Sequence, residues 1–195
     1  MSRHAQLGRI CEQEKGRYVA LRRMDIESVV VGSGPLPSLV VLRPRDEQDG
    51  SPELQLPIRI GSIEATAISM GVSPREGRRP MTHDLLASSI EALGAQCARV
   101  RIVGVEGTIF FAQVELLRED GEQVLVDARP SDAIALAVRA EAPVFAEEDV
   151  LSVAALPDFR SVEKDEQERE LAEFHEFVES LSPEDFNVSP NAGEE

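Results

Sequence analysis

Apolar residues recur with strand-like spacing through the first third of the chain and switch to helical spacing near residue 63. The segments 25–31, 38–43 and 54–60 combine aliphatic residues with polar neighbours, and Gly-Ser-Gly-Pro at 32–35 separates the first two. A period of two predicts half-buried strands, and a glycine–proline cluster predicts a turn. Apolar positions spaced three and four apart then predict a helix over 63–72.

The second half of the chain shows the same two periods in the opposite order. A helix is predicted to begin at Thr82 and to end before Gly94, because glycine is the usual residue just past a helix end. Three strands are predicted to follow at 98–105, 108–117 and 123–127. Short polar links containing glycine join them, which is typical of antiparallel hairpins.

The stretch from Val124 to Arg139 is the centre of the pattern. It opens as a strand, and Pro130 ends the pairing because proline has no N–H and a fixed φ. Ser131 is then the expected N-cap, and Asp132 places a negative charge in the first helical turn. Apolar residues on nearly every side of the following helix predict that it is buried.

Together these elements predict an α+β fold with a largely antiparallel or mixed sheet and packed helices. Residues 1–23 show no usable periodicity, so they are interpreted as a flexible extension or as residues upstream of a start at Met24. The folded domain is predicted over 24–155. Residues 156–195 are predicted to be an acidic helical tail whose end, from residue 187, is disordered.

The acidic tail dominates the net charge of −16. From Glu147 onward there are 16 acidic and 3 basic residues, whereas residues 1–146 hold 20 acidic and 17 basic residues. A narrow apolar stripe at Leu171, Phe174, Val178 and Leu181 runs along this charged segment. The tail is therefore expected to be an appendage that docks on the body, pairs with a partner or frays.

Composition excludes several protein classes. The two cysteines, Cys11 and Cys97, have neither disulfide-framework nor zinc-like spacing, and no apolar run approaches membrane-spanning length. A cytoplasmic protein without membrane contact is expected. No Walker loop, dinucleotide fingerprint, nucleophile elbow or zinc-protease motif is present, so no organic cofactor is predicted.

Two segments concentrate groups that can do chemistry, namely 78–84 (R-R-P-M-T-H-D) and 127–132 (D-A-R-P-S-D). Each has a proline, a hydroxyl residue in a capping position and an acid in the first helical turn. One interpretation is structural, because Thr82 with Asp84 and Ser131 with Asp132 are what well-capped helices contain. The other interpretation requires that both helix starts face one cleft.

If they do, the residues divide into three chemical roles. Helix N-termini and arginines bind phosphate, which assigns substrate binding to Arg79, Arg129 and Ser131. His83 is suited to proton transfer near neutral pH. Carboxylates hold Mg²⁺ or Mn²⁺, and the candidate acids are Asp84, Asp127 and Asp132, with Asp127 and Asp132 as the metal pair. Glu64 is a further candidate, although a solvated helix face is the favoured interpretation of it.

Three strings, in this order, resemble the bifunctional nuclease domain family. They are L-P-I-R-I-G-S-I-E-A at 56–65, R-P-M-T-H-D-L-L at 79–86 and V-D-A-R-P-S-D-A-I-A-L-A-V-R at 126–139. The resemblance spans roughly residues 25–155. It implies an α+β domain, a homo-dimer or larger homo-oligomer, and nuclease activity on DNA and RNA. It supplies no catalytic assignment residue by residue.

The sequence therefore leaves two alternative functions. The first is a metal-assisted nuclease, a hydrolase that cuts DNA and RNA with little sequence preference. The second is a non-catalytic module that binds an anion or a protein on the same fold. The net negative charge favours the second, because charge repulsion weakens nucleic-acid binding. The resemblance favours the first.

Overall fold

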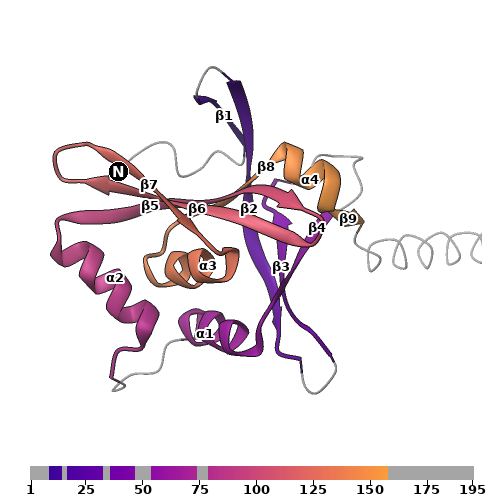
Figure 1. Ribbon diagram of the computed structural model, residues 1–195, viewed down its shortest axis with the longest axis horizontal. Coiled ribbons are helices and arrows are strands. Elements are labelled where there is room, and N and C mark those ends of the chain that lie inside the picture. The colour runs from indigo at the N-terminus through magenta and orange to yellow at the C-terminus, as the bar shows by residue number, and fades with distance from the viewer. Residues whose placement is uncertain (1–8, 15–16, 33–35, 47–53, 74–78, 158–195) are drawn as a thin grey trace, which may run out of the picture. The chain divides into compact units, whose positions relative to one another are not determined.

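The computed structural model describes residues 9–14, 17–32, 36–46, 54–73 and 79–157 (Figure 1). The chain divides into two units, 1–157 and 158–195. The first unit contains all of the described residues. The predictions for the helical tail and its apolar stripe therefore lie outside the described residues.

The described part of the first unit contains a nine-stranded sheet in the order β7-β6-β5-β8-β2-β3-β4-β9, with β1 paired to β2 outside this path. All neighbouring strands are antiparallel except β5 and β8, which run parallel. The predicted α+β class with a largely antiparallel, mixed sheet is confirmed. The bounds are β1 Arg9–Glu14, β2 Arg17–Val30, β3 Ser38–Pro44, β4 Leu54–Ile60, β5 Ala95–Glu106, β6 Ile109–Arg118, β7 Gln123–Ala128, β8 Val144–Glu147 and β9 Leu156–Pro157.

Four helices accompany the strands in the described ranges, and three of them lie together below the sheet in Figure 1. Helix α3 packs against α1, α2, β5 and β6, whereas α4 packs against β2, β5 and β8. The central place of α3 follows from its composition, because an all-round apolar helix must be covered on every side. The bounds are α1 Ser62–Val72, α2 Thr82–Ala92, α3 Pro130–Arg139 and α4 Glu148–Ala154.

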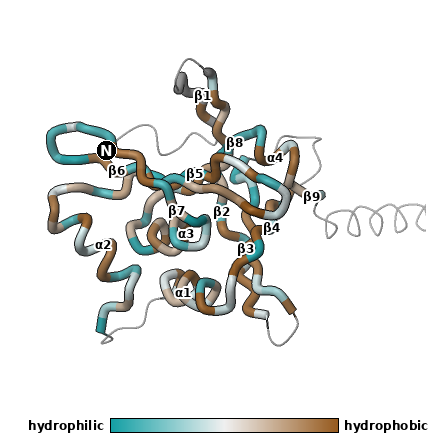
Figure 2. The backbone as a smooth tube through the Cα atoms, in the orientation of Figure 1, coloured by the Kyte–Doolittle hydropathy of each residue, from teal (hydrophilic) through white to brown (hydrophobic). Residues whose placement is uncertain are grey.

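The main core lies between the sheet and these helices. Ile134 of α3 is fully buried, as are Val100 and Ile102 of β5 and Ile68 of α1. Strand β3 alternates buried and half-buried positions along its whole length, as its sequence predicts. Figure 2 shows hydrophobic stretches both along the central strands and along α2. Helix α2 nevertheless has no buried residue.

The structure corrects the prediction for residues 17–23. They form the first half of β2, and Leu21 in this segment is fully buried against Val19 and Phe145. A domain boundary at residue 24 would therefore fall inside a strand. The segment holds a short apolar run, Tyr18 to Leu21, between arginines, and this run lacks the polar–apolar alternation that predicts a strand.

Within the described ranges, no helix has the length and apolar character needed to cross a membrane.

The predicted role of Gly94 at the end of α2 is confirmed. Gly94 follows the helix with a φ of 72°. This is the left-handed conformation, which glycine adopts without steric cost.

Candidate functional site

The N-termini of α1, α2 and α3 open onto one shared hollow of about 500 Å³. Each helix contributes residues from its first turn, so the two facing helix starts expected from the sequence are joined by a third. Free N–H groups and the positive ends of three helix dipoles are thereby gathered in one place. The lining residues are Ser62, Ile63, Glu64, Thr66, Ala67, Met81, Thr82, His83, Arg129, Asp132 and Arg139.

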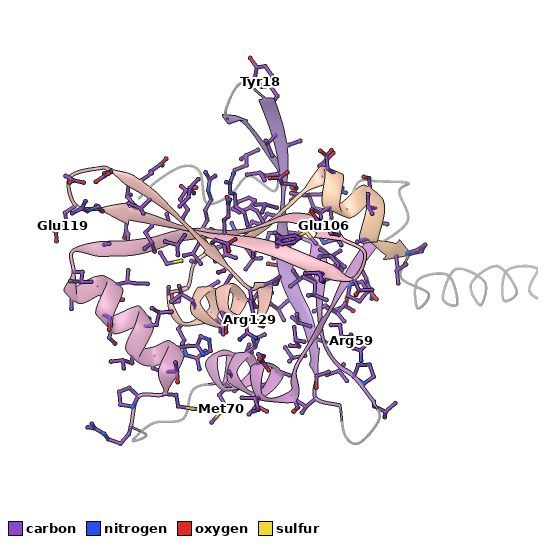
Figure 3. The ribbon with its side chains drawn as sticks, viewed as in Figure 1. Tyr18, Arg59, Met70, Glu106, Glu119 and Arg129 are labelled. Atoms are coloured by element: carbon purple, nitrogen blue, oxygen red, sulfur yellow. The ribbon has the colours of Figure 1, made fainter. Side chains whose placement is uncertain are left out.

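Arg129 lies at the mouth of this hollow, between α3 and α1 (Figure 3). It is the N-cap residue of α3, with φ −69° and ψ 144°. The residue before a proline is driven toward extended backbone, so Pro130 becomes the first helical residue and Arg129 the cap. The expectation that Ser131 caps the helix is therefore wrong. Ser131 sits inside the first turn and is buried.

Asp132 joins the polar groups of the hollow. Its Oδ2 accepts a hydrogen bond of 2.8 Å from Nε of Arg129, and its Oδ1 lies 3.3 Å from Nε2 of His83. Burial acts to raise the pKa of this carboxyl, but the hydrogen bonds and positive charge of Arg129 and His83 outweigh it. The pKa of Asp132 is lowered as a result. Asp132 is therefore ionised at neutral pH.

His83 comes from the first turn of α2, 49 residues before Asp132, and its side chain is 15% exposed. An ionised carboxylate can only accept hydrogen bonds, so Nε2 of His83 must carry the hydrogen that faces Asp132. In the neutral imidazole the lone pair then resides on Nδ1. The pair thus fixes which nitrogen of His83 is able to take up a proton.

Glu64 is brought into the hollow from α1. Its Oε1 accepts a hydrogen bond of 3.2 Å from Nη1 of Arg129. Two carboxylates, Glu64 and Asp132, therefore share one guanidinium, and their hydrogen bonds and charges raise the pKa of Arg129, those of Asp132 most strongly. The solvated face considered for Glu64 is thus not its environment. The signal in the sequence is its place in a first helical turn, which it shares with His83 and Asp132.

Asp84 binds Arg139 and the backbone of Met81 instead of Arg129. Its Oδ2 accepts a hydrogen bond of 2.8 Å from the backbone N–H of Met81, and its Oδ1 accepts one from Nε of Arg139. The hydrogen bonds from Met81 and Arg139 lower the pKa of Asp84. Met81, rather than Thr82, is the N-cap of α2. Asp84 therefore closes the start of α2 and anchors it to the last turn of α3.

Besides Asp84, three further residues predicted to take part are not among the lining residues of the hollow. Asp127 is exposed on β7, opposite Gln113 of β6. Arg79 is exposed ahead of α2. Ser131 is buried beneath the start of α3. Strand-to-helix turns put neighbouring residues on different sides of the chain, which spacing in the sequence does not reveal.

The described residues do not form a ready metal site. No three His, Cys, Asp or Glu side chains among them lie close enough together to hold a metal ion. In the hollow, both oxygens of Asp132 already accept hydrogen bonds, and Glu64 faces the same guanidinium. The donor set that the described residues offer at the hollow therefore does not fit Mg²⁺ or Mn²⁺, which prefer several free oxygen ligands.

A family model described as the bifunctional nuclease domain matches residues 40–158, more than half of the chain. The chain belongs to the bifunctional nuclease domain family. Two curated proteins of Mycobacterium tuberculosis, from strains CDC 1551 / Oshkosh and ATCC 25618 / H37Rv, are each 41% identical to it over 142 residues. These alignments cover 69% of this chain and 82% of each relative, and both relatives are titled uncharacterized proteins.

All of the ion-paired residues of the hollow fall inside the range that matches the bifunctional nuclease domain. The match begins at Val40 in β3, so β1 and β2 precede it. The residues that line the three-helix hollow thus all lie within the matched domain.

Proposed function

We propose that this bifunctional nuclease domain hydrolyses phosphodiester bonds of DNA and RNA in the three-helix hollow. The observation that carries the proposal is the contact of His83 with Asp132, 3.3 Å apart, beside the exposed guanidinium of Arg129. A base of fixed tautomer next to an arginine is what water activation at a phosphate requires. The family supports the same class of reaction.

In this mechanism the phosphate enters the hollow and binds Arg129 through its non-bridging oxygens. Nδ1 of His83 takes a proton from a water molecule, and the oxygen of that water attacks phosphorus. Asp132 stabilises the imidazolium that forms, because it keeps its negative charge beside Nε2. The bond from phosphorus to the leaving oxygen breaks with its electron pair, and the proton on His83 passes through water to that oxygen, which restores the neutral imidazole. The free helix N–H groups favour the negative charge on the phosphate.

Divalent metal assistance stays a prediction for this chain. The described residues do not supply a donor set that fits Mg²⁺ or Mn²⁺, so the steps above use only the chain's own groups. Asp127, which the sequence paired with Asp132 as a ligand, is the residue that distinguishes the two cases. If a metal takes part, an Asp127→Asn change must weaken cutting.

A second function is favoured by the charges of the hollow. Glu64 and Asp132 share Arg129, so an incoming phosphate meets a guanidinium that is already engaged. An arginine that is already ion-paired is compatible with a non-catalytic module that binds a small anion or a protein on the same fold. It differs from the nuclease in one measurable way, because it binds without cutting.

We also propose that the domain forms a homo-dimer or a larger homo-oligomer. Strand β7 ends the sheet order of the described residues, and Leu125 and Val126 on it are 46% and 42% exposed. Leu85 and Leu93, on α2 and just after it, are 62% and 82% exposed. An edge strand and exposed apolar side chains are features that a second copy would cover. Light scattering after gel filtration tests this, and a protein that stays monomeric at high concentration would contradict it.

The activity test uses purified full-length protein with a labelled DNA duplex and a labelled RNA, each with Mg²⁺, Mn²⁺ or EDTA. We expect cutting by the wild type and a loss of about 10²–10⁴-fold in His83→Ala and Asp132→Asn, the range for a missing general base. Glu106→Gln, at an exposed site on the end of β5, is the control outside the hollow, and Asp127→Asn tests whether a metal takes part. Equal cutting by all variants would point to a contaminant, and binding without cutting would favour the second function.

A further inference from the structure

Arg129 forms hydrogen bonds with two carboxylates of the protein, so its guanidinium is already engaged before a phosphate binds. It donates to Asp132 through Nε and Nη2, at 2.8 and 3.4 Å, and to Glu64 through Nη1 at 3.2 Å. Asp132 is also the partner of His83, so losing its contact would disturb the base. Glu64 is the carboxylate that can leave Arg129 without touching the His83–Asp132 pair.

The position of Glu64 depends on a missing side chain at Gly61. A Cβ on Gly61 would lie 2.2 Å from Oε2 of Glu64 and 3.1 Å from its Cδ. The carboxylate is thus folded back over the start of α1, into space that only glycine leaves open. Gly61 has extended backbone with φ −76° and ψ 161°. Any residue adopts this conformation, so a side chain at position 61 would meet the Glu64 carboxylate and not backbone strain.

We propose that Glu64 is an internal competitor for the phosphate group, which holds Arg129 in the absence of phosphate and releases the guanidinium when phosphate binds. Glu64 is then a positioning residue that sets the affinity of the hollow for anions. The inference rests on the proposed function only in taking phosphate as the ligand of Arg129. It requires no cutting.

Two substitutions release Arg129 in different ways. Glu64→Gln removes the competing charge, whereas Gly61→Ala keeps every charge and displaces the carboxylate. Both are expected to bind phosphate more tightly than the wild type, by about two- to fivefold, the range for an exposed ion pair. Glu106→Gln removes one negative charge at an exposed site on the end of β5 and is the matched control.

The test measures binding of inorganic phosphate by calorimetry and of a short fluorescent single-stranded DNA by anisotropy, in full-length protein. Tighter binding by Glu64→Gln and Gly61→Ala, with Glu106→Gln unchanged, supports the inference. The gain must also disappear when Arg129→Gln is added to Glu64→Gln, because the competition acts through that guanidinium. Unchanged or weaker binding by Glu64→Gln, no measurable binding by it, an equal gain in Glu106→Gln, or no gain in Gly61→Ala overturns it.

Failure of this inference and failure of the proposed function are separable. If the wild type does not cut nucleic acid but Glu64→Gln binds phosphate more tightly, the nuclease proposal fails and the competitor stands. If the wild type cuts, Glu64→Gln is expected to lower KM with kcat unchanged, which is the effect of stronger uniform binding. A fall in kcat at unchanged KM would instead give Glu64 a role in the chemical step and overturn the competitor.

Discussion

At the scale of single residues, one carboxylate organises the hollow. Asp132 accepts hydrogen bonds from Arg129 and from His83, and it keeps its charge at neutral pH because its pKa is lowered. The same charge fixes the tautomer of His83 and the direction of Arg129. A neutral amide at this position can accept or donate, so Asp132→Asn would lose the orientation while keeping the shape.

Asp84 plays a structural part that is testable through pH. Its pKa is lowered by hydrogen bonds from Met81 and Arg139. The ionised Asp84 carboxylate therefore stabilises the fold fully above the ordinary pKa of an aspartate. This stabilisation is lost as pH falls through the lowered pKa. The Asp84 side chain is 41% exposed, so solvent screens this effect. We expect Asp84→Asn to reduce the free energy of unfolding at neutral pH by about 1 kcal/mol, as urea unfolding measures.

The difference between wild type and Asp84→Asn is expected to shrink as the solution is made strongly acidic. Asp84→Ala is the companion variant, because asparagine can still accept from the Met81 N–H and alanine cannot. It should be less stable than Asp84→Asn at every pH, since it also loses the helix cap. A gap between wild type and Asp84→Asn that stays constant with pH would contradict the role given to this charge.

At the scale of elements, most of the fold could be predicted from periodicity. The strand at 54–60 and the start of α2 at Thr82 match the predictions to the residue, and α1 begins one residue early. Neither α2 nor α3 takes its predicted hydroxyl cap. At α3 the reason is that Pro130 moves the cap to the residue before it. No local pattern predicts β1 or the parallel pairing of β5 with β8, which depends on distant contacts.

Helix α3 is the element on which the domain depends most. Ile134 is fully buried in the core between the sheet and the helices. We expect Ile134→Ala to lower the free energy of unfolding by about 2–5 kcal/mol, through lost burial and the cavity it leaves. Val153 on α4 is 75% exposed, so Val153→Ala should cost less than about 0.5 kcal/mol. Comparable losses in both, measured by urea unfolding, would contradict the packing described.

The crossing of α1 and α3 is close enough to exclude a methyl group. A Cβ on Gly71 would lie 2.7 Å from Nη1 of Arg139 and 3.1 Å from Cγ1 of Val138. Alanine normally stabilises a helix relative to glycine. Arg139 is buried here and bound to Asp84. We therefore expect Gly71→Ala to destabilise the protein by about 1–3 kcal/mol.

The neighbouring substitution Val72→Ala is the control for Gly71→Ala, since Val72 is 53% exposed on the same turn of α1. It should change the free energy of unfolding by less than about 0.5 kcal/mol. Thermal unfolding of both variants provides the comparison. A Gly71→Ala protein more stable than the wild type would mean that Arg139 moves aside at little cost.

At the scale of the whole molecule, the candidate site is assembled from segments that are remote in sequence. Glu64, His83 and Arg129 belong to three helix starts, and Arg129 contacts a residue 65 positions away. Motif spacing could nominate His83, Arg129 and Asp132, because each sits at a helix start. It could not place Asp127 outside the hollow or bring Glu64 into it, since those facts follow from how β7 and α1 pack.

The distribution of charge along the chain leads to a prediction about the C-terminal segment. Residues 158–195 hold 13 acidic and 3 basic residues, so they account for −10 of the net charge of −16. The residues that line the hollow all belong to the other unit of the chain, residues 1–157. We expect a protein truncated after Pro157 to stay folded and to bind single-stranded DNA more tightly, because a strong repulsion for phosphate has been removed.

Salt concentration distinguishes this electrostatic effect from a loss of tail-specific contacts. The gain in affinity of the truncated protein should be large at about 50 mM salt and should shrink at about 300 mM, since screening weakens repulsion between separated charges. Anisotropy of a labelled oligonucleotide measures the affinity, and urea unfolding checks the fold. A gain that is independent of salt would indicate instead that the segment covers the binding surface directly. An unfolded truncated protein would show that residues 158–195 are part of the folded unit.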